Sequence, residues 1–343
     1  MPEGCLEGTA SILSYIKNNK PQNNRNSSTM HYNCKIIALI TLVAFVTGCT
    51  ENNLPEPELL PVTVSASSEP LTRADDTFVN NNFTEGKRMG VFGYTYTSSW
   101  QFYLLPDFFN NQPMTIKSAG SLSYSPLRYW PSGNKKVSLY AYYPYDGDVS
   151  NIEPNVNYGM GTFTYTTPTT ASAQTDFMVT RRLDNLTSSS GTVNLRFYQV
   201  LACIEINVNL TGSSYKQIKE VKVTNVWTKG RFNPYIMNDD LNAIPVSDDW
   251  RTNAWPEEFM EDRQDMVVTG ELHENTSLDA EDNHLYKLLV IPQRCIDGLM
   301  EIQLTMVSNT DVTETKTYNL YDYTSSHKWE AGKRYSYTVT PAP

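Results

Sequence analysis

The stretch Val193–Leu210, which reads VNLRFYQVLACIEINVNL, decides the fold. Apolar side chains occupy the odd positions over 193–197 and the even positions over 204–210. Alternation with a period of two is typical of a β-strand with one buried face. A single regular strand would point the two sets of side chains to opposite faces. We therefore expect core-facing strands on both sides of a bulge or a helical turn between Tyr198 and Cys203.

Short alternating segments of this kind recur along the chain, separated by Gly, Pro, Asn and Asp. They are Val62–Ala66, Arg88–Tyr96, Val137–Tyr143, Val221–Val223, Tyr286–Ile291, Met300–Met306 and Tyr335–Val339. Tyrosine is abundant, with 22 residues, and Thr and Val recur in short runs, a composition that favours strands over helices. The sequence thus predicts an all-β protein built from β-sandwiches.

The length and composition limit the number of domains and the kinds of partner that the chain can have. Apolar residues make up 40% of the chain and charged residues 19%, which is enough to bury a core, and the length suits two domains. Thr211–Ser214 follows the longest alternating strand and is typical of a linker. We place an N-terminal β-sandwich domain at 61–212 and a C-terminal one at 213–343. The net charge is −10 without a basic cluster, so a nucleic-acid partner is not expected.

A short apolar run, Ile36–Val46, follows a cation and leads through small residues to Cys49. The run is too short to cross a bilayer of about 30 Å as a helix, and its layout is that of a secretory signal. Residues 46–49, VTGC, resemble the lipobox of bacterial lipoproteins. This resemblance implies cleavage before Cys49 and attachment of acyl chains such as palmitate to it. The alternative is an ordinary secretory signal that ends near a cysteine.

We do not expect the signal or the segment before it to take part in the fold. We interpret 30–48 as a lipoprotein signal peptide that starts at Met30, and 1–29 as a non-native N-terminal extension. Residues 49–60 are polar, acidic and rich in proline, which is typical of an extended tether.

Motifs for catalysis and metal binding are missing from the sequence. It contains no HExxH, no CxxC, no G-x-S-x-G and no glycine-rich phosphate loop. Paired carboxylates such as Asp239 and Asp240 are typical of solvated loops, although a glycosidase would need two carboxylates facing each other in a cleft. We therefore predict no enzymatic activity, no metal site and no cofactor.

Aromatic clusters are the remaining candidates for a ligand site. Their tryptophans are Trp100, Trp130, Trp250 and Trp255. Indoles aligned on one exposed face would suit a glycan-binding outer-membrane surface lipoprotein that does not polymerise, which is the alternative function. Burial of the same indoles would make them part of a sandwich core or edge instead.

A series of segments, taken in order, resembles the fimbrillin family, which comprises the FimA/Mfa-type pilins and the fimbrillin-like lipoproteins of anaerobic gut and oral bacteria. The segments are Leu71–Ala74, Glu85–Phe92, Arg128–Pro131, Ala141–Tyr145, Thr175–Met178, Val193–Ile206, Leu288–Gln293 and Trp329–Tyr335. The resemblance runs from the lipobox almost to the C-terminus. It implies two tandem transthyretin-like β-sandwich domains, lipid anchoring at the cell outer membrane, surface exposure and a place in a fimbrium.

The resemblance also implies a way of assembly. In polymerising relatives a protease cuts after an arginine in the loop that follows the first strand, and a strand from another subunit fills the groove. Arg73, followed by Ala74, is the matching residue here. We see no spare strand after Tyr335–Thr340 to donate, so we expect a tip or accessory pilus subunit that contributes to cell adhesion. Its expected partners are other pilin subunits, the outer membrane, and a host or bacterial surface receptor or glycan.

Overall fold

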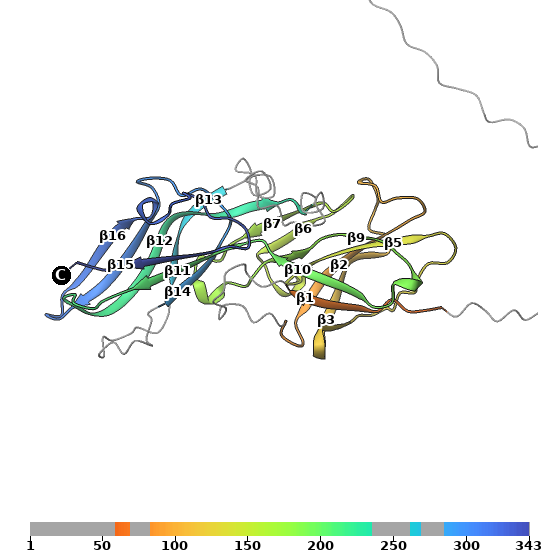
Figure 1. The fold of residues 1–343 in the computed structure, drawn as a ribbon, viewed down its shortest axis with the longest axis horizontal. Helices are drawn as coiled ribbons and strands as arrows, with labels where there is room; N and C mark the ends of the chain where they lie inside the picture. The colour runs from red at the N-terminus through yellow and green to blue at the C-terminus, as the bar shows by residue number, and fades with distance from the viewer. Residues whose placement is uncertain (1–58, 69–82, 235–260, 269–284, 343) are drawn as a thin grey trace, which may run out of the picture. The chain divides into compact units, whose positions relative to one another are not determined.

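The structure, a computed structural model, describes residues 59–68, 83–234, 261–268 and 285–342, which belong to one compact unit (Figure 1). The described residues are almost entirely strands, with a few single-turn 3-10 helices, so the all-β prediction is confirmed. Within these ranges no helix has the length and apolar composition needed to cross a bilayer. The strands are β1 (Val64–Ser68), β2 (Arg88–Tyr96), β3 (Phe109–Ile116), β4 (Ser121–Ser123), β5 (Lys136–Tyr143), β6 (Ile152–Asn155), β7 (Thr162–Thr166), β8 (Met178–Thr180), β9 (Leu183–Leu186), β10 (Val193–Gln199), β11 (Ala202–Val208), β12 (Tyr215–Phe232), β13 (Glu261–Val268), β14 (Leu285–Val290), β15 (Glu301–Ser308), β16 (Thr313–Asn319) and β17 (Arg334–Val339).

The strands up to β10, apart from β6 and β7, form one sheet in the order β2-β3-β4-β1-β10-β8-β5-β9 (Figure 1). Because β5 also pairs with β2, the order from β2 to β5 closes on itself as a ring, and β9 adds to β5 alone. Closure of a sheet leaves no unpaired strand edge within the ring. Apolar side chains that include Met89, Val91, Leu139, Leu195 and Phe197 fill it, and we call this set the ring core.

The strands β2 and β5 are buried on both faces. Their residues Val91 and Leu139 lie in the ring core, whereas Phe92 and Tyr140 belong to a second apolar cluster. That cluster, which we call the junction cluster, also contains Phe163 of β7, Phe177, Leu201, Phe232 of β12, Leu289 of β14 and Ile291. Burial on both faces explains why β2 and β5 are rich in aromatic and apolar residues at successive positions.

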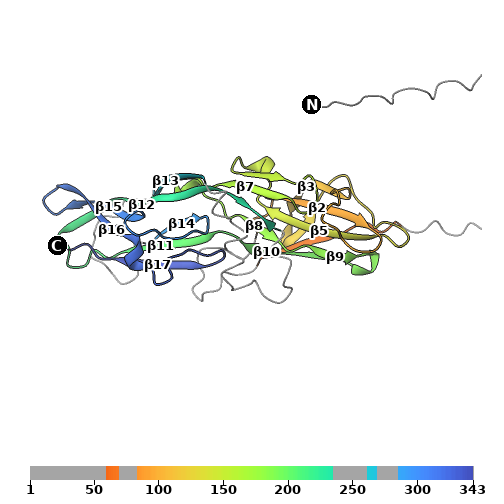
Figure 2. The ribbon, with the colours of Figure 1, turned by 90° about the horizontal axis from the view of Figure 1, so that it is seen from above.

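The C-terminal strands form two sheets (Figure 2). One has the order β14-β11-β17, and the other has the order β16-β15-β12-β7-β6 with β13 paired to β12. A third core includes Ile204 and Ile206 of β11, Leu288 of β14, Val223 of β12 and Leu304 of β15. Two sheets that share one apolar core have the architecture of a β-sandwich.

The predicted break within Val193–Leu210 is confirmed, but its cause differs from the expected bulge or helical turn. The strand β10 ends at Gln199, the chain bends at Leu201, and β11 begins at Ala202. β10 pairs with β1 and β8, whereas β11 pairs with β14 and β17. The phase of the alternation changes because the chain passes from one sheet and core to another.

The division into domains at 212 and 213 stays a proposal. The strand β11 lies before this point in the sequence but pairs only with strands that follow it. The hairpin of β6 and β7 also precedes it, and β7 pairs with β12. These pairings favour a boundary at the bend at Leu201, with the β6–β7 hairpin contributed to the second sandwich.

Candidate functional site

The strand β1 closes the ring between β4 and β10 (Figure 1). It runs parallel to β10 from the pair Val64 and Val193 to the pair Ser68 and Phe197. On its other side it pairs antiparallel with β4 at Val64 and Ser65. Loss of β1 would leave backbone N–H and C=O groups of β4 and β10 without strand partners.

Alternate side chains of the first strand point into the ring core. Val62, Val64 and Ala66 are only 2%, 3% and 9% exposed. They pack within the cluster that holds Ile116 of β3 and Leu195 of β10. Full burial of a valine side chain stabilises a fold by about 1.5–3 kcal/mol, so loss of this strand would open an apolar groove at a large cost.

The opposite face of β1 is polar and contacts β10 through short side chains. The hydroxyls of Thr63 and Thr192 lie 3.1 Å apart. Ser65 donates a hydrogen bond to the Oδ1 of Asn194 at 3.4 Å, and the Nδ2 of Asn194 donates to the Oγ of Ser67 at 3.1 Å. These exposed contacts add little free energy, but they favour one register of the strand.

The chain before β1 is held by the segment between β4 and β5. The N–H of Val62 donates to the carbonyl of Arg128 at 2.9 Å, and the N–H of Trp130 donates to the carbonyl of Leu60 at 3.0 Å. The hydroxyl of Tyr124 donates to the carbonyl of Val62 at 2.7 Å. Burial raises the pKa of Tyr124 further above neutrality.

Gly120 lets the chain approach β1 closely. Its φ of +73° lies in the left-handed region, and a Cβ built on it would lie 2.5 Å from the carbonyl oxygen of Ala66. Any larger residue would push this turn away from β1. Sequence reasoning missed Gly120 because only its turn-forming neighbours, Ser118–Ser121, are visible locally, while Ala66 is distant in sequence.

The end of β1 borders a pocket of about 520 Å³. Ser68 and Phe83 line it together with the turn that contains Gly120. The ring of Phe83 packs edge-on against Phe197 of β10 at 5.1 Å between centroids. The predicted processing residues Arg73 and Ala74 fall between Ser68 and Phe83, outside the described residues, as does the predicted lipidation site Cys49.

The structure does not bring Trp100 and Trp130 together. Trp130 is 6% exposed and belongs to the ring core. Trp100 is half-buried against the junction cluster, with the guanidinium of Arg182 3.6 Å from the centre of its ring. These two indoles therefore do not align on an exposed face and lend no support to glycan binding. Trp250 and Trp255 lie outside the described residues.

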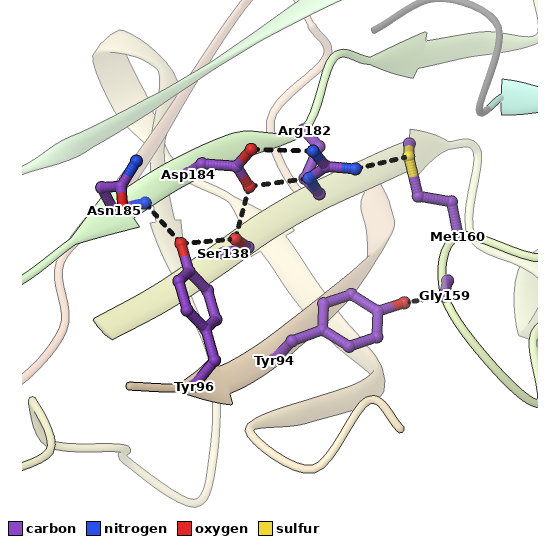
Figure 3. A network of polar contacts seen from close by, with 8 residues as sticks. All are labelled: Tyr94, Tyr96, Ser138, Gly159, Met160, Arg182, Asp184 and Asn185. Atoms are coloured by element: carbon purple, nitrogen blue, oxygen red, sulfur yellow. Dashed lines mark hydrogen bonds and ion pairs between the residues drawn. The ribbon is translucent and has the colours of Figure 1, made fainter. Parts of the chain in front are cut away.

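Arg182, which lies over this indole, belongs to a polar network whose other members are drawn in Figure 3. Two nitrogens of Arg182 donate to the carboxylate of Asp184 at 2.7 and 2.8 Å. Ser138 donates to the same carboxylate and lies 3.1 Å from the hydroxyl of Tyr96, which accepts from the N–H of Asn185 at 2.6 Å. These paired groups bind β9 to β2 and β5 and are satisfied within the fold, which marks the network as structural.

Within the described ranges, no three or more His, Cys, Asp or Glu side chains are placed to share an ion. The arrangement around β1 instead combines backbone pairing on both sides of the strand with apolar side chains that enter the ring core.

The family model described as fimbrillin-like matches residues 72–343. The chain belongs to this fimbrillin-like family. The match covers most of the chain and nearly all of the described residues, so the resemblance seen in the sequence is confirmed.

Individual relatives of this fimbrillin-like chain are distant. The fimbrium subunit Fim1C of Phocaeicola vulgatus is 27% identical over 119 residues, which are 33% of this chain and 31% of that protein. The matched part therefore spans about a third of the length of that relative.

Solved structures share the fold. A candidate cell adhesion protein from Bacteroides uniformis aligns with a TM-score of 0.53 and 18% identity over 82% of this chain and 94% of that chain. A candidate cell adhesion protein from Bacteroides ovatus gives a TM-score of 0.52 and 17% identity, over 83% of this chain and 94% of that chain. At such identities the likeness concerns the fold alone.

Proposed function

We propose that this chain is a surface-exposed fimbrial subunit that assembles by exchanging β1 for a strand of another subunit. The observation that carries the proposal is the place of β1, which alone joins β4 to β10 and fills the ring core. Arg73 follows the end of β1 by five residues in the sequence. A cut between Arg73 and Ala74 would leave β1 held by non-covalent contacts only.

The physical chemistry of the groove favours a durable joint. An incoming strand would satisfy the backbone groups of β4 and β10 and refill the sites of Val62, Val64 and Ala66. The replacement restores the buried area that the departing strand takes away, so exchange costs little at equilibrium. Release of an inserted strand without a replacement would expose the groove to water, which makes dissociation slow.

Family membership supports an adhesive or structural role in the fimbrium rather than an enzymatic one. We propose a tip or accessory position, with other pilin subunits as partners and a surface receptor beyond them. Export as a lipoprotein through Cys49 belongs to the same proposal and would place the protein at the cell outer membrane.

Cleavage by an arginine-specific protease tests the exchange. The full-length chain is cut in the presence of an excess of a biotinylated peptide with the sequence of residues 59–68. We expect SDS-resistant incorporation of biotin after the cut, because the peptide matches the groove. The uncut chain and an Arg73→Ala variant treated with protease serve as controls and should stay unlabelled. Cut chain that never takes up the peptide would overturn strand exchange.

Acylation of Cys49 is tested by mass spectrometry of the protein made in a host that processes lipoproteins. We expect an N-terminal peptide that begins at Cys49 and carries the mass of acyl chains, because the lipobox directs both steps. A Cys49→Ser variant should keep residues of the signal peptide. A wild-type protein that retains residues before Cys49 would rule out the anchor.

A further inference from the structure

An apolar patch lies where the chain enters β1. It consists of Leu59, Leu60, Pro61, Leu127 and Tyr129. The two leucines before the strand are 63% and 46% exposed, Leu127 is 56% exposed and Tyr129 is 43% exposed. Large apolar side chains exposed together, rather than singly, mark a surface that contacts something other than water.

The backbone holds the two halves of this apolar patch side by side. Pro61 and Tyr129 form an antiparallel bridge, and hydrogen bonds on both sides of the bridge keep the register. Since Val62 points into the ring core, the alternation along an extended chain turns Leu59 and Pro61 outward. Leu60 alternates to the side of Val62 and borders the apolar patch from there, and the hydrogen bond from Trp130 to the carbonyl of Leu60 ties this end of the chain to the ring.

The charges around the apolar patch differ from those of the whole chain. The chain has a net charge of −10, but residues 59–68 carry no charge. Residues 124–136 carry Arg128, Lys135 and Lys136 and no acidic residue. Both Arg128 and Lys135 are exposed. Leucines and an amphipathic tyrosine, with the cation Arg128 between Leu127 and Tyr129, are typical of a surface that lies at the interface of a lipid bilayer.

The length of chain before the apolar patch identifies the surface that the patch contacts. Cys49 precedes Leu59 by ten residues, which span at most about 35 Å when fully extended. We infer that the apolar patch rests on the bilayer in which acyl chains on Cys49 are inserted. The inference rests on the proposed lipid anchor, since only an anchor at Cys49 holds the apolar patch this close to lipid.

Acidic residues in the connecting segment limit the electrostatic part of this contact. Glu51, Glu56 and Glu58 lie between Cys49 and the apolar patch and are repelled by anionic lipids. The apolar side chains must therefore supply the contact on a neutral bilayer, and Arg128 and Lys135 add to it on an anionic one. Vesicles of both kinds separate the two contributions.

Contact with the bilayer would couple anchoring to assembly. A cut after Arg73 separates Leu59, Leu60 and Pro61, together with Cys49, from the rest of the chain. Once β1 has left, only Leu127 and Tyr129 of the apolar patch would stay on the ring. The event that frees β1 to leave would thus also loosen the hold of the ring on the membrane.

Photolabelling from the bilayer tests this inference. The full-length acylated protein is placed in phosphatidylcholine vesicles, with or without phosphatidylglycerol, that contain a diazirine-bearing phosphatidylcholine. Labelled residues are mapped by mass spectrometry. We expect several-fold more label on the segments around Leu59 and Leu127 than at Phe102 and Tyr103. Phe102 and Tyr103 are a demanding internal control, because these aromatic side chains are 68% and 60% exposed and lie outside the apolar patch.

Paired variants sharpen the test. Leu127→Ser combined with Tyr129→Ser should also reduce labelling around Leu59, because both halves of the apolar patch sit on one surface. Phe102→Ser combined with Tyr103→Ser removes comparable exposed apolar groups and should leave labelling around Leu59 unchanged. Acylated protein with no more label at the apolar patch than at Phe102 and Tyr103 would overturn the inference. Absence of the acyl group itself, read from the same spectra, would instead refute the anchor.

Discussion

Val64→Asp should lower the free energy of unfolding by about 4 kcal/mol or more and release β1 from the ring. The Val64 side chain is 3% exposed in the ring core, and its cross-strand neighbours Leu122 and Val193 are apolar. A carboxylate there would be buried without a partner, which is among the most destabilising single changes known for a core. The chain can avoid that burial by letting β1 leave the ring.

Thermal and denaturant unfolding measure this loss, and amide exchange over β4 and β10 reports whether the ring has opened. Thr63→Asp is the matched control, since it places the same group one residue earlier on the exposed face of the strand. We expect that variant to stay within about 1 kcal/mol of the wild type. Equal stabilities for the two variants would mean that β1 does not close the core.

Asp176→Asn should stabilise the protein at neutral and alkaline pH and leave it nearly unchanged at pH 4. Both carboxyl oxygens of Asp176 are buried, although part of the residue reaches the surface. Burial raises the pKa of Asp176 to about 7, and the Gln199 amide and the backbone N–H of Phe177 oppose this shift. The surroundings include Tyr143, whose pKa burial and this carboxyl both raise.

The direction of this pH dependence follows from the number of protons that the folded and unfolded states bind. Between about pH 4 and pH 7 the folded state keeps a proton on Asp176 that the unfolded state has lost, so the wild type loses stability as pH rises through this window. Asparagine cannot ionise. The advantage of the variant should therefore grow from near zero at pH 4 to about 2 kcal/mol or more at pH 8.

Denaturant unfolding across this pH range, read as the difference between variant and wild type, checks the result. Asp322→Asn removes an exposed carboxylate and should follow the wild-type profile. A pH-independent difference for Asp176→Asn would show that this carboxyl titrates alike in the folded and unfolded states.

Local alternation found about half of the described strands. The expected segments fall in nine of the seventeen, and β3, β4, β6, β7, β8, β9, β13 and β16 were not expected. Arg88–Tyr96 is the strand β2 with the expected bounds, and Tyr335–Val339 falls within β17. The failure at β12 has a physical cause. Only Val221–Val223 was expected, whereas the strand extends over Tyr215–Phe232. Its pairing with β13 and β15 shifts register at several points, and each shift changes the phase of the apolar positions.

The candidate site was only partly visible in the sequence. The first strand was expected at Val62–Ala66, and its apolar residues do face the core. Its role as the closing strand depends on pairing with Val193, 129 positions away, and on a turn at Gly120 that reaches the carbonyl of Ala66. The exposure of the tryptophans could not be predicted from the sequence either, because it depends on which distant side chains cover Trp100 and Trp130.

The sequence by itself determined that this protein is made of strands and that it resembles the fimbrillins, and it predicted an export signal with a lipobox. Each of these properties depends on residues that are close in the sequence, because it is recognised from a period of two or from short motifs. Only the tertiary structure decided that β1 closes a ring, that β10 and β11 belong to different cores, and that Pro61 pairs with Tyr129. Those facts depend on contacts between residues far apart in the chain, and local periodicity constrains the faces of a strand but not its neighbours.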